Sequence, residues 1–226
     1  MNNPIVKAVL FWSLAAGLFL TIIFSTSLHL FWTRESTIFP HYFVDQTDPF
    51  PRYGSFEDMG MLRGMEFRVL GANAYKLSSF VGDCGIYLHQ ANDFGLSCPP
   101  YKYRVLVPWL ADIIQRLSGV SIPTAFILVN IFATLLAGLG FTAYLNHELV
   151  FPKMLALLGG LLSITCVSIT RTLPFPMLEP MSFLASLMVF WSLRRKNPWL
   201  FAAASIFAIA TKEVFVFATP LYWVLN

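Results

Sequence analysis

The sequence predicts an all-α integral membrane protein with about five transmembrane helices and one large extracytoplasmic loop. Of its 226 residues, 57% are apolar and only 12% are charged, whereas a soluble domain has about 25% charged residues. Most of the charged side chains lie in one stretch, residues 33–118. The apolar runs on both sides of this stretch are long enough to form helices that cross a bilayer.

This composition excludes several classes of protein. A nucleic-acid-binding module needs a basic face, and a disordered tail needs many charges. A secreted miniprotein held by disulfides needs more than the three cysteines present here. We therefore expect the lipid bilayer as a partner and no nucleic acid.

The first expected transmembrane helix covers residues 8–32. Between Lys7 and Arg34 lie 26 uncharged residues, which at about 1.5 Å of rise per residue exceed a hydrocarbon core of about 30 Å. A cleaved signal peptide is the alternative, because Ser25 and Ser27 resemble a small-x-small cleavage site. The apolar region of a signal peptide is normally only about 7–15 residues long, which favours a retained helix.

Four further spans are expected, at residues 122–145, 154–170, 174–193 and 198–223. The third of these reaches the length that a bilayer needs only by including Glu179. Its start, PFPMLEP, predicts a broken segment at the membrane surface, because proline removes backbone donors. The last span contains Lys212 and Glu213.

Basic residues in short loops favour the cytoplasmic side of a membrane and so orient the chain. With the N-terminus in the cytoplasm, five of them lie inside: Lys7, Lys153, Arg194, Arg195 and Lys196. Only Arg171 then lies outside. This orientation makes the loop 33–118 extracytoplasmic, and it places Glu179, Lys212 and Glu213 toward the same outer face.

Three short helices are expected in the external loop. A pattern like a capping box at Ser55 begins the first, which runs to residue 70. Asp83 caps the second, which Gly95 ends. The third, residues 105–118, carries an apolar stripe from Leu106 to Leu117, which predicts an interfacial helix along the membrane surface.

Two cysteines of the loop, Cys84 and Cys98, are candidates for a disulfide in an oxidising compartment, with two unpaired thiols as the alternative. No CxxC or HExxH spacing predicts a zinc site. The sequence leaves the participation of a divalent metal open.

Charged residues near or within apolar segments mark candidate chemistry. Glu179, Lys212 and Glu213 are costly to insert unless they pair or face water, so they indicate a functional cavity. A salt bridge between Lys212 and Glu213, or snorkelling to the interface, is the structural alternative. In the loop, Asp83 is a candidate general base and Arg104 a candidate phosphate ligand, with a helix cap and an interfacial anchor as their ordinary roles.

Two segments resemble a known family. The string GDCGIYLHQANDFGLSCPPYKYRVLVPWLA, residues 82–111, is similar to the first external loop of bacterial integral-membrane glycosyltransferases of the GT-C fold. The stretch LEPMSFLASLMVFWSLRRKNPWLFAAASIFAIATKEVFVFATPLYW, from residue 178, resembles their acidic-Pro start, apolar helix, basic turn and helix that ends in Thr-Lys-Glu. The resemblance covers the chain from about Gly82 onward.

This resemblance implies transfer of a sugar from a polyprenyl-phosphate donor to an extracytoplasmic acceptor, in a bacterial inner (plasma) membrane. It makes Asp83 the catalytic base, with Asp45 and Asp48 as runners-up because the acidic residue of many relatives lies soon after the first span. Arg104 and Lys212 become donor-phosphate ligands, and Glu213 orients Lys212. The remaining substrate-binding candidates are Tyr87, Arg171 and Glu179.

The family generally has more spans than the five expected here, so the resemblance implies an N-terminal portion of such an enzyme. The sugar and the acceptor, whether a glycan, a lipid or a protein, depend on pocket shape and are not encoded in these motifs. Two other functions stay open. One is a transporter or flippase for a lipid-linked saccharide, and the other is a non-catalytic membrane assembly factor.

Overall fold

The computed structural model describes residues 4–32, 66–68, 74–76, 87, 90, 91, 103–166, 178–218, 220 and 222. This part of the chain is helical apart from one pair of short strands. Its six α-helices are α1 (Pro4–Trp32), α3 (Leu106–Ser118), α4 (Ile122–His147), α5 (Lys153–Ile164), α7 (Glu179–Arg195) and α8 (Pro198–Thr211). A 3-10 helix, η4 (Glu213–Ala218), follows α8.

The strands β1 (Glu66–Arg68) and β2 (Ala74–Lys76) pair antiparallel, with Phe67 opposite Tyr75. Because Glu66–Arg68 is extended, the helix that was expected to reach residue 70 does not continue that far. Of the helix expected after Asp83, the structure describes Tyr87, Gln90 and Ala91, and all three are helical.

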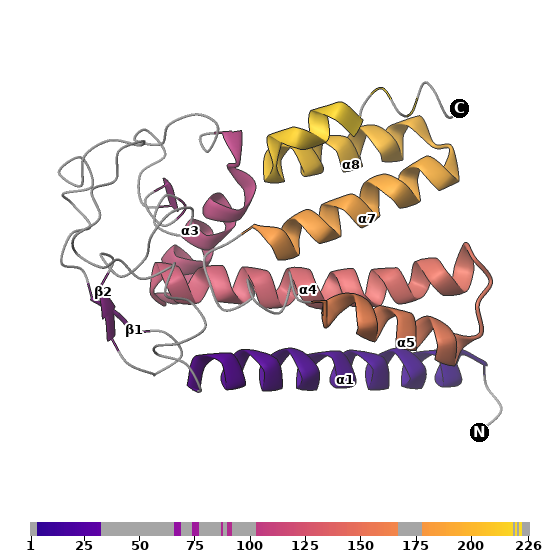
Figure 1. Cartoon of the computed structure of the whole chain (residues 1–226), viewed down its shortest axis with the longest axis horizontal. Coiled ribbons are helices and arrows are strands. Elements are labelled where there is room, and N and C mark those ends of the chain that lie inside the picture. Colours follow the sequence, from indigo (N-terminus) through magenta and orange to yellow (C-terminus); the bar gives the residue numbers. More distant parts are fainter. Residues whose placement is uncertain are drawn as a thin grey trace.

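Helix α4 lies at the centre of the bundle and packs against α1, α3, α5 and α7. Figure 1 shows α1 on one side of α4, with α7 and then α8 on the other. Helix α3 lies across the end of the bundle where α4 and α7 begin. We call this end the α3 end.

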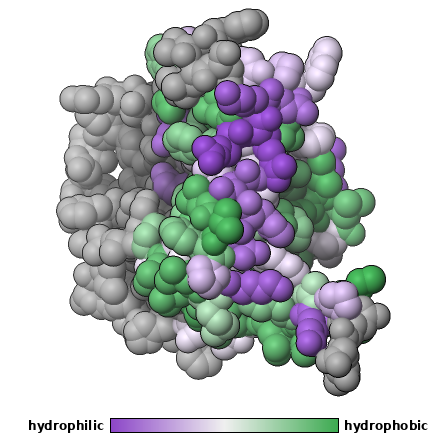
Figure 2. All heavy atoms as spheres, turned by 90° about the vertical axis from the view of Figure 1, so that its right-hand side faces the viewer, coloured by the Kyte–Doolittle hydropathy of each residue, from purple (hydrophilic) through white to green (hydrophobic). Residues whose placement is uncertain are grey.

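The opposite end of the bundle holds the start of α1 and the connections α4–α5 and α7–α8 (Figure 1). We call it the basic end, because five basic residues fall in these segments: Lys7, Lys153, Arg194, Arg195 and Lys196. Figure 2 looks onto this end and shows a hydrophilic band between hydrophobic areas. The fold therefore places the short basic segments at the opposite end of the bundle from α3 (Figure 1).

Two helices of the described residues are long and apolar enough to cross a membrane, Pro4–Ser25 within α1 and Thr124–His147 within α4. The second agrees with the helix expected at residues 122–145. Large apolar side chains are exposed along both, including Leu14 on α1 and Phe132 on α4. A helix that is apolar on its exposed face is unusual in a soluble protein.

Helices α5 and α7 are shorter than the spans expected for them. Helix α5 ends at Ile164 instead of residue 170, and with 12 residues it is about 18 Å long. Helix α7 begins at Glu179 instead of residue 174. An acidic residue followed by proline suits the first turn of a helix, because the carboxylate complements the helix dipole and proline needs no hydrogen-bond partner there.

The helix expected over residues 198–223 is divided. Helix α8 ends at Thr211, Lys212 is extended (φ −155°, ψ 123°), and η4 follows. The chain then turns back along α8, as two contacts of Tyr222 show. Its ring stacks on Phe201 with centroids 4.8 Å apart, and its hydroxyl donates to the Lys196 carbonyl (3.4 Å). At about 21 Å, α8 is too short to cross the hydrocarbon core alone.

Helix α3 differs in one respect from the expected interfacial helix. It spans almost the predicted residues, but its buried side chains are Val107, Pro108 and Ala111. Two members of the predicted apolar stripe, Trp109 and Leu117, are exposed. Leu106, Leu110 and Ile114 of the stripe pack against the core of the bundle, so only part of the apolar stripe faces outward.

Candidate functional site

Three side chains from distant segments meet at the α3 end. The Arg104 guanidinium donates from Nε to Oε2 and from Nη2 to Oε1 of Glu213, each at 2.7 Å. Its Nη1 donates to the hydroxyl of Tyr87 at 2.7 Å. Arg104 lies just before α3, Tyr87 belongs to the helical segment before it, and Glu213 opens η4. This arginine cluster, Tyr87–Arg104–Glu213, joins the external loop to the turn after α8.

The arginine cluster is largely removed from solvent. The side chains of Arg104 and Glu213 are 12% and 30% exposed, and Tyr87 is buried. Hydrogen bonding to the Glu213 carboxylate raises the pKa of Arg104 above its usual value, although burial acts against it. A part-buried, charge-assisted pair of this kind stabilises by about 2 kcal/mol relative to a structure that lacks one partner.

Lys212 lies beside the arginine cluster at the tip of the α8–η4 hairpin. Its amide donates to the Ala208 carbonyl (2.8 Å), and its carbonyl accepts from the Phe215 amide (3.1 Å). Within the described part of the chain, the Lys212 ammonium makes no hydrogen bond or salt bridge. It is therefore the cation of this end that is available to an anion.

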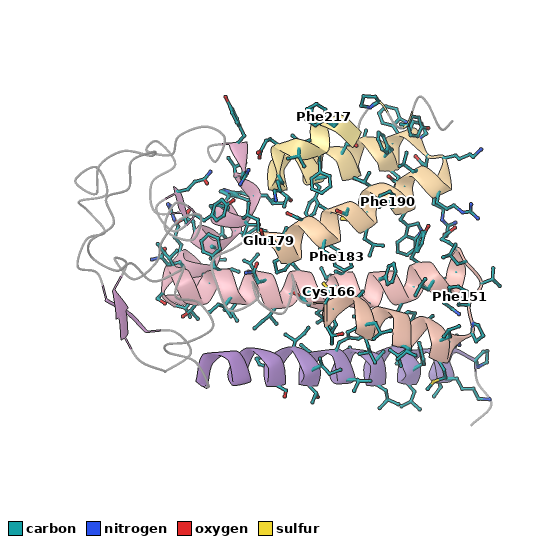
Figure 3. All side chains as sticks on the ribbon, in the orientation of Figure 1. Phe151, Cys166, Glu179, Phe183, Phe190 and Phe217 are labelled. Carbon is teal, nitrogen blue, oxygen red and sulfur yellow. The ribbon has the colours of Figure 1, made fainter. Side chains whose placement is uncertain are left out.

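The start of α7 lies next to this hairpin tip. Ala185 of α7 and Ala208 of α8 belong to one hydrophobic cluster, and the two helices pack against each other. Figure 3 shows Glu179 at the end of α7 that faces α3. Glu179 and Ser182 are three residues apart and so share one face of the helix.

Several buried polar atoms around this end lack a partner. Gln90 is 1% exposed, and neither its amide nitrogen nor its amide oxygen is hydrogen-bonded to any described residue. Over the same part of the chain, Oε2 of Glu179 and Oγ of Ser182 are buried without a hydrogen bond. Each buried polar group without a partner lowers the stability of the fold by about 1–3 kcal/mol. Three residues with such groups at the α3 end therefore call for an explanation.

The structure brings together four of the predicted site residues: Tyr87, Arg104, Lys212 and Glu213. Glu213 also has a partner that was not predicted, because it accepts two hydrogen bonds from Arg104, whereas its expected role of orienting Lys212 stays a prediction. Glu179 lies at the same end of the bundle. The other predicted site residues, Asp45, Asp48, Asp83, Cys84, Cys98 and Arg171, lie outside the described residues.

Gln90 and Ser182 were not predicted as site residues. Each lies three positions after a predicted one, Gln90 after Tyr87 and Ser182 after Glu179. Helical spacing places such pairs on a common face. A search for polar residues at this spacing from each candidate would have found both.

A second polar contact lies at the basic end. Glu148 Oε1 accepts from the Arg195 guanidinium (2.6 Å) and from the Trp191 indole nitrogen (3.0 Å). These bonds tie the α4–α5 connection to α7. Because they lie far from the arginine cluster, we interpret them as a structural clamp.

No group of three or more His, Cys, Asp or Glu side chains able to hold a metal ion occurs among the residues that the structure describes. No family model, no curated protein and no solved structure matches the chain. The geometry of the α3 end therefore carries the functional argument.

Proposed function

We propose that the chain is an integral membrane glycosyltransferase that takes a sugar from a polyprenyl-phosphate donor. Its active site would lie at the α3 end, on the extracytoplasmic side. The two long apolar helices, the apolar side chains exposed along them and the basic residues at the opposite end support a membrane location with the N-terminus in the cytoplasm.

The observation that carries this function is the uncommitted Lys212 ammonium beside the arginine cluster. When a glycosidic bond to a lipid phosphate breaks, the leaving phosphate gains negative charge, and a fixed cation stabilises that charge in a site shielded from water. Two hydrogen bonds fix the backbone of Lys212 where α8 ends, next to Glu213 of the arginine cluster. Its ammonium therefore suits a phosphate held at the α3 end.

Arg104 has a different role in this proposal from the one its sequence motif implies. Three of its five N–H groups already donate to Glu213 and Tyr87. Arg104 then braces the hairpin tip, and Lys212 is the residue that meets the phosphate. Asp83, which lies four residues before Tyr87 in the sequence, is the candidate base that activates the acceptor hydroxyl.

Two variants of the full chain test this function in native membranes supplied with labelled polyprenyl-phosphate sugars. Asp83→Asn should abolish release of polyprenyl phosphate while donor binding persists. Lys212→Met should weaken donor binding at least tenfold, equivalent to about 1.4 kcal/mol. Lys153→Met, at the basic end, is the matched control and should bind the donor like the wild type.

Retained turnover in Asp83→Asn would remove Asp83 from the catalytic role. Unchanged donor affinity in Lys212→Met would overturn phosphate binding at the hairpin tip.

A flippase for a lipid-linked saccharide is the second candidate, and the break between α8 and η4 favours it, because transporters use interrupted helices at their binding sites. Proteoliposomes separate the two functions. A flippase moves a labelled lipid-linked sugar between leaflets without cleaving it, whereas a transferase releases polyprenyl phosphate. A non-catalytic assembly factor would do neither.

A further inference from the structure

Gln90, Glu179 and Ser182 present buried polar atoms that no described residue satisfies. Buried polar groups in native proteins nearly always have a hydrogen-bond partner. Here the unsatisfied atoms include both ends of one amide, an oxygen of one carboxylate and one hydroxyl. Three residues with this shortage, gathered at one end of a bundle, indicate a ligand that supplies the missing bonds.

These residues border one hydrophobic cluster. Tyr87 and Ala91, which flank Gln90 on its helical segment, belong to the same cluster as Leu178 and Met181. Leu178 and Met181 are the immediate neighbours of Glu179 and Ser182 in the sequence. Tyr87 also bonds to Arg104, so the helical segment that carries Gln90 is tied to the arginine cluster.

The chemistry of the three side chains selects the kind of ligand. A carboxylate only accepts hydrogen bonds, an amide both donates and accepts, and a hydroxyl does either. Neighbouring hydroxyl groups of a sugar supply both donors and acceptors to such a set. A phosphate has no donor for Glu179 and would be repelled by its charge, and a polyprenyl chain has no polar atoms at all.

We propose that Gln90, Glu179 and Ser182 form a subsite for the hydroxyl groups of a saccharide, next to the cation at Lys212. This inference rests on the proposed function and deepens it, because it assigns the sugar and the phosphate of one donor to different residues. Lys212 holds the phosphate, and the subsite distinguishes a glycosylated lipid phosphate from an unglycosylated one.

The test compares the affinity of the purified full chain in lipid nanodiscs for polyprenyl phosphate and for its glucosyl, mannosyl, galactosyl and arabinosyl esters. The wild type should bind at least one ester more tightly than the unglycosylated lipid. Gln90→Met and Ser182→Ala should each reduce that preference at least fivefold and leave the affinity for polyprenyl phosphate unchanged. Lys212→Met should weaken the binding of both.

Matched controls separate recognition from a general loss of structure. Gln115→Met makes the same exchange on α3, and Ser205→Ala removes another buried hydroxyl without a partner among the described residues; both should keep the preference. The thermal midpoints of Gln90→Met and Ser182→Ala should not fall below that of the wild type, because each exchange removes an unsatisfied polar group.

Each result has one interpretation. If Gln90→Met and Ser182→Ala keep the preference while Lys212→Met still weakens both ligands, the saccharide subsite is wrong and the donor site stands. If the wild type binds neither polyprenyl phosphate nor its esters, the proposed function fails and the subsite fails with it.

Discussion

Arg104 is the residue on which the α3 end depends. Its guanidinium forms two bonds to Glu213 and one to Tyr87, a planar arrangement that lysine cannot reproduce. The same pair fixes the start of η4 and the segment that leads into α3. Loss of either charge leaves the other part-buried without its counter-ion.

We expect Glu213→Gln to lower the free energy of unfolding by about 2 kcal/mol, because a neutral amide accepts weaker bonds than a carboxylate and leaves the arginine uncompensated. Thermal unfolding in detergent micelles measures this change. Arg116→Gln breaks the exposed Arg116–Asp112 pair on α3 and should cost less than about 0.5 kcal/mol. Equal losses in the two variants would contradict a special role for Arg104.

At the residue scale, the sequence singled out four side chains that the structure brings to one end of the bundle, but it did not predict that Arg104 bonds to Glu213. The motif around Arg104 and the charges at Lys212 and Glu213 were visible because charges are rare in apolar segments. The pair of Arg104 and Glu213 was not predicted, because 109 positions separate the two residues. Spacing along a chain does not encode contacts over that distance.

Helices α1, α4 and α5 pack closely through small residues. A Cβ atom placed on Gly160 of α5 would overlap the Thr142 hydroxyl, and it would lie 2.8 Å from the Gly138 carbonyl and 3.0 Å from the Phe19 ring. Thr142 and Gly138 belong to α4 and Phe19 to α1. Backbone approach between α4 and α5 therefore requires glycine at position 160, as small residues do at many helix contacts in membranes.

Gly160→Ala should destabilise the protein by about 1–3 kcal/mol, because the added methyl group meets backbone and cannot be accommodated by one rotamer change. The measurement is again thermal unfolding in micelles. Gly17→Ala is the matched control on α1, since a Cβ there meets nothing within 4 Å. That variant should be neutral or slightly stabilising, because alanine favours a helix more than glycine does. A neutral Gly160→Ala would mean that α5 packs differently.

At the element scale, uniform apolar runs were predicted well and interrupted ones were not. Helix α4 was expected at residues 122–145 because it lies in a long uncharged run, and it spans Ile122–His147. The run after Asn197 has a similar hydropathy, but the chain reverses at Lys212. A straight helix and a helical hairpin can be built from the same apolar side chains. The hydropathy of the run therefore does not distinguish them.

At the scale of the whole molecule, the path of the chain after α8 differs from the expected last span. One helix over residues 198–223, with the N-terminus in the cytoplasm, would place Tyr222 outside. The hairpin of α8 and η4 instead returns Tyr222 to Phe201 and Lys196, at the basic end. The two arrangements therefore differ in the side of the membrane on which Tyr222 lies.

Single-cysteine variants distinguish these topologies in cells. In a background with the native cysteines replaced by serine, Tyr222→Cys should react with an impermeant maleimide only after the membrane is opened. Lys196→Cys should behave in the same way, and Leu117→Cys on exposed α3 should react in intact cells. Labelling of Tyr222→Cys in intact cells would instead support one continuous helix over residues 198–223.

The pairing of Arg104 with Glu213 also sets an order of assembly. Arg104 leaves the ribosome 109 residues before its partner, an interval of roughly 5–20 s at usual rates of synthesis. During that interval the arginine has no counter-ion from the hairpin. The arginine cluster is thus completed only when η4 has been made, and a nascent chain that stalls before Glu213 leaves Arg104 without its ion pair.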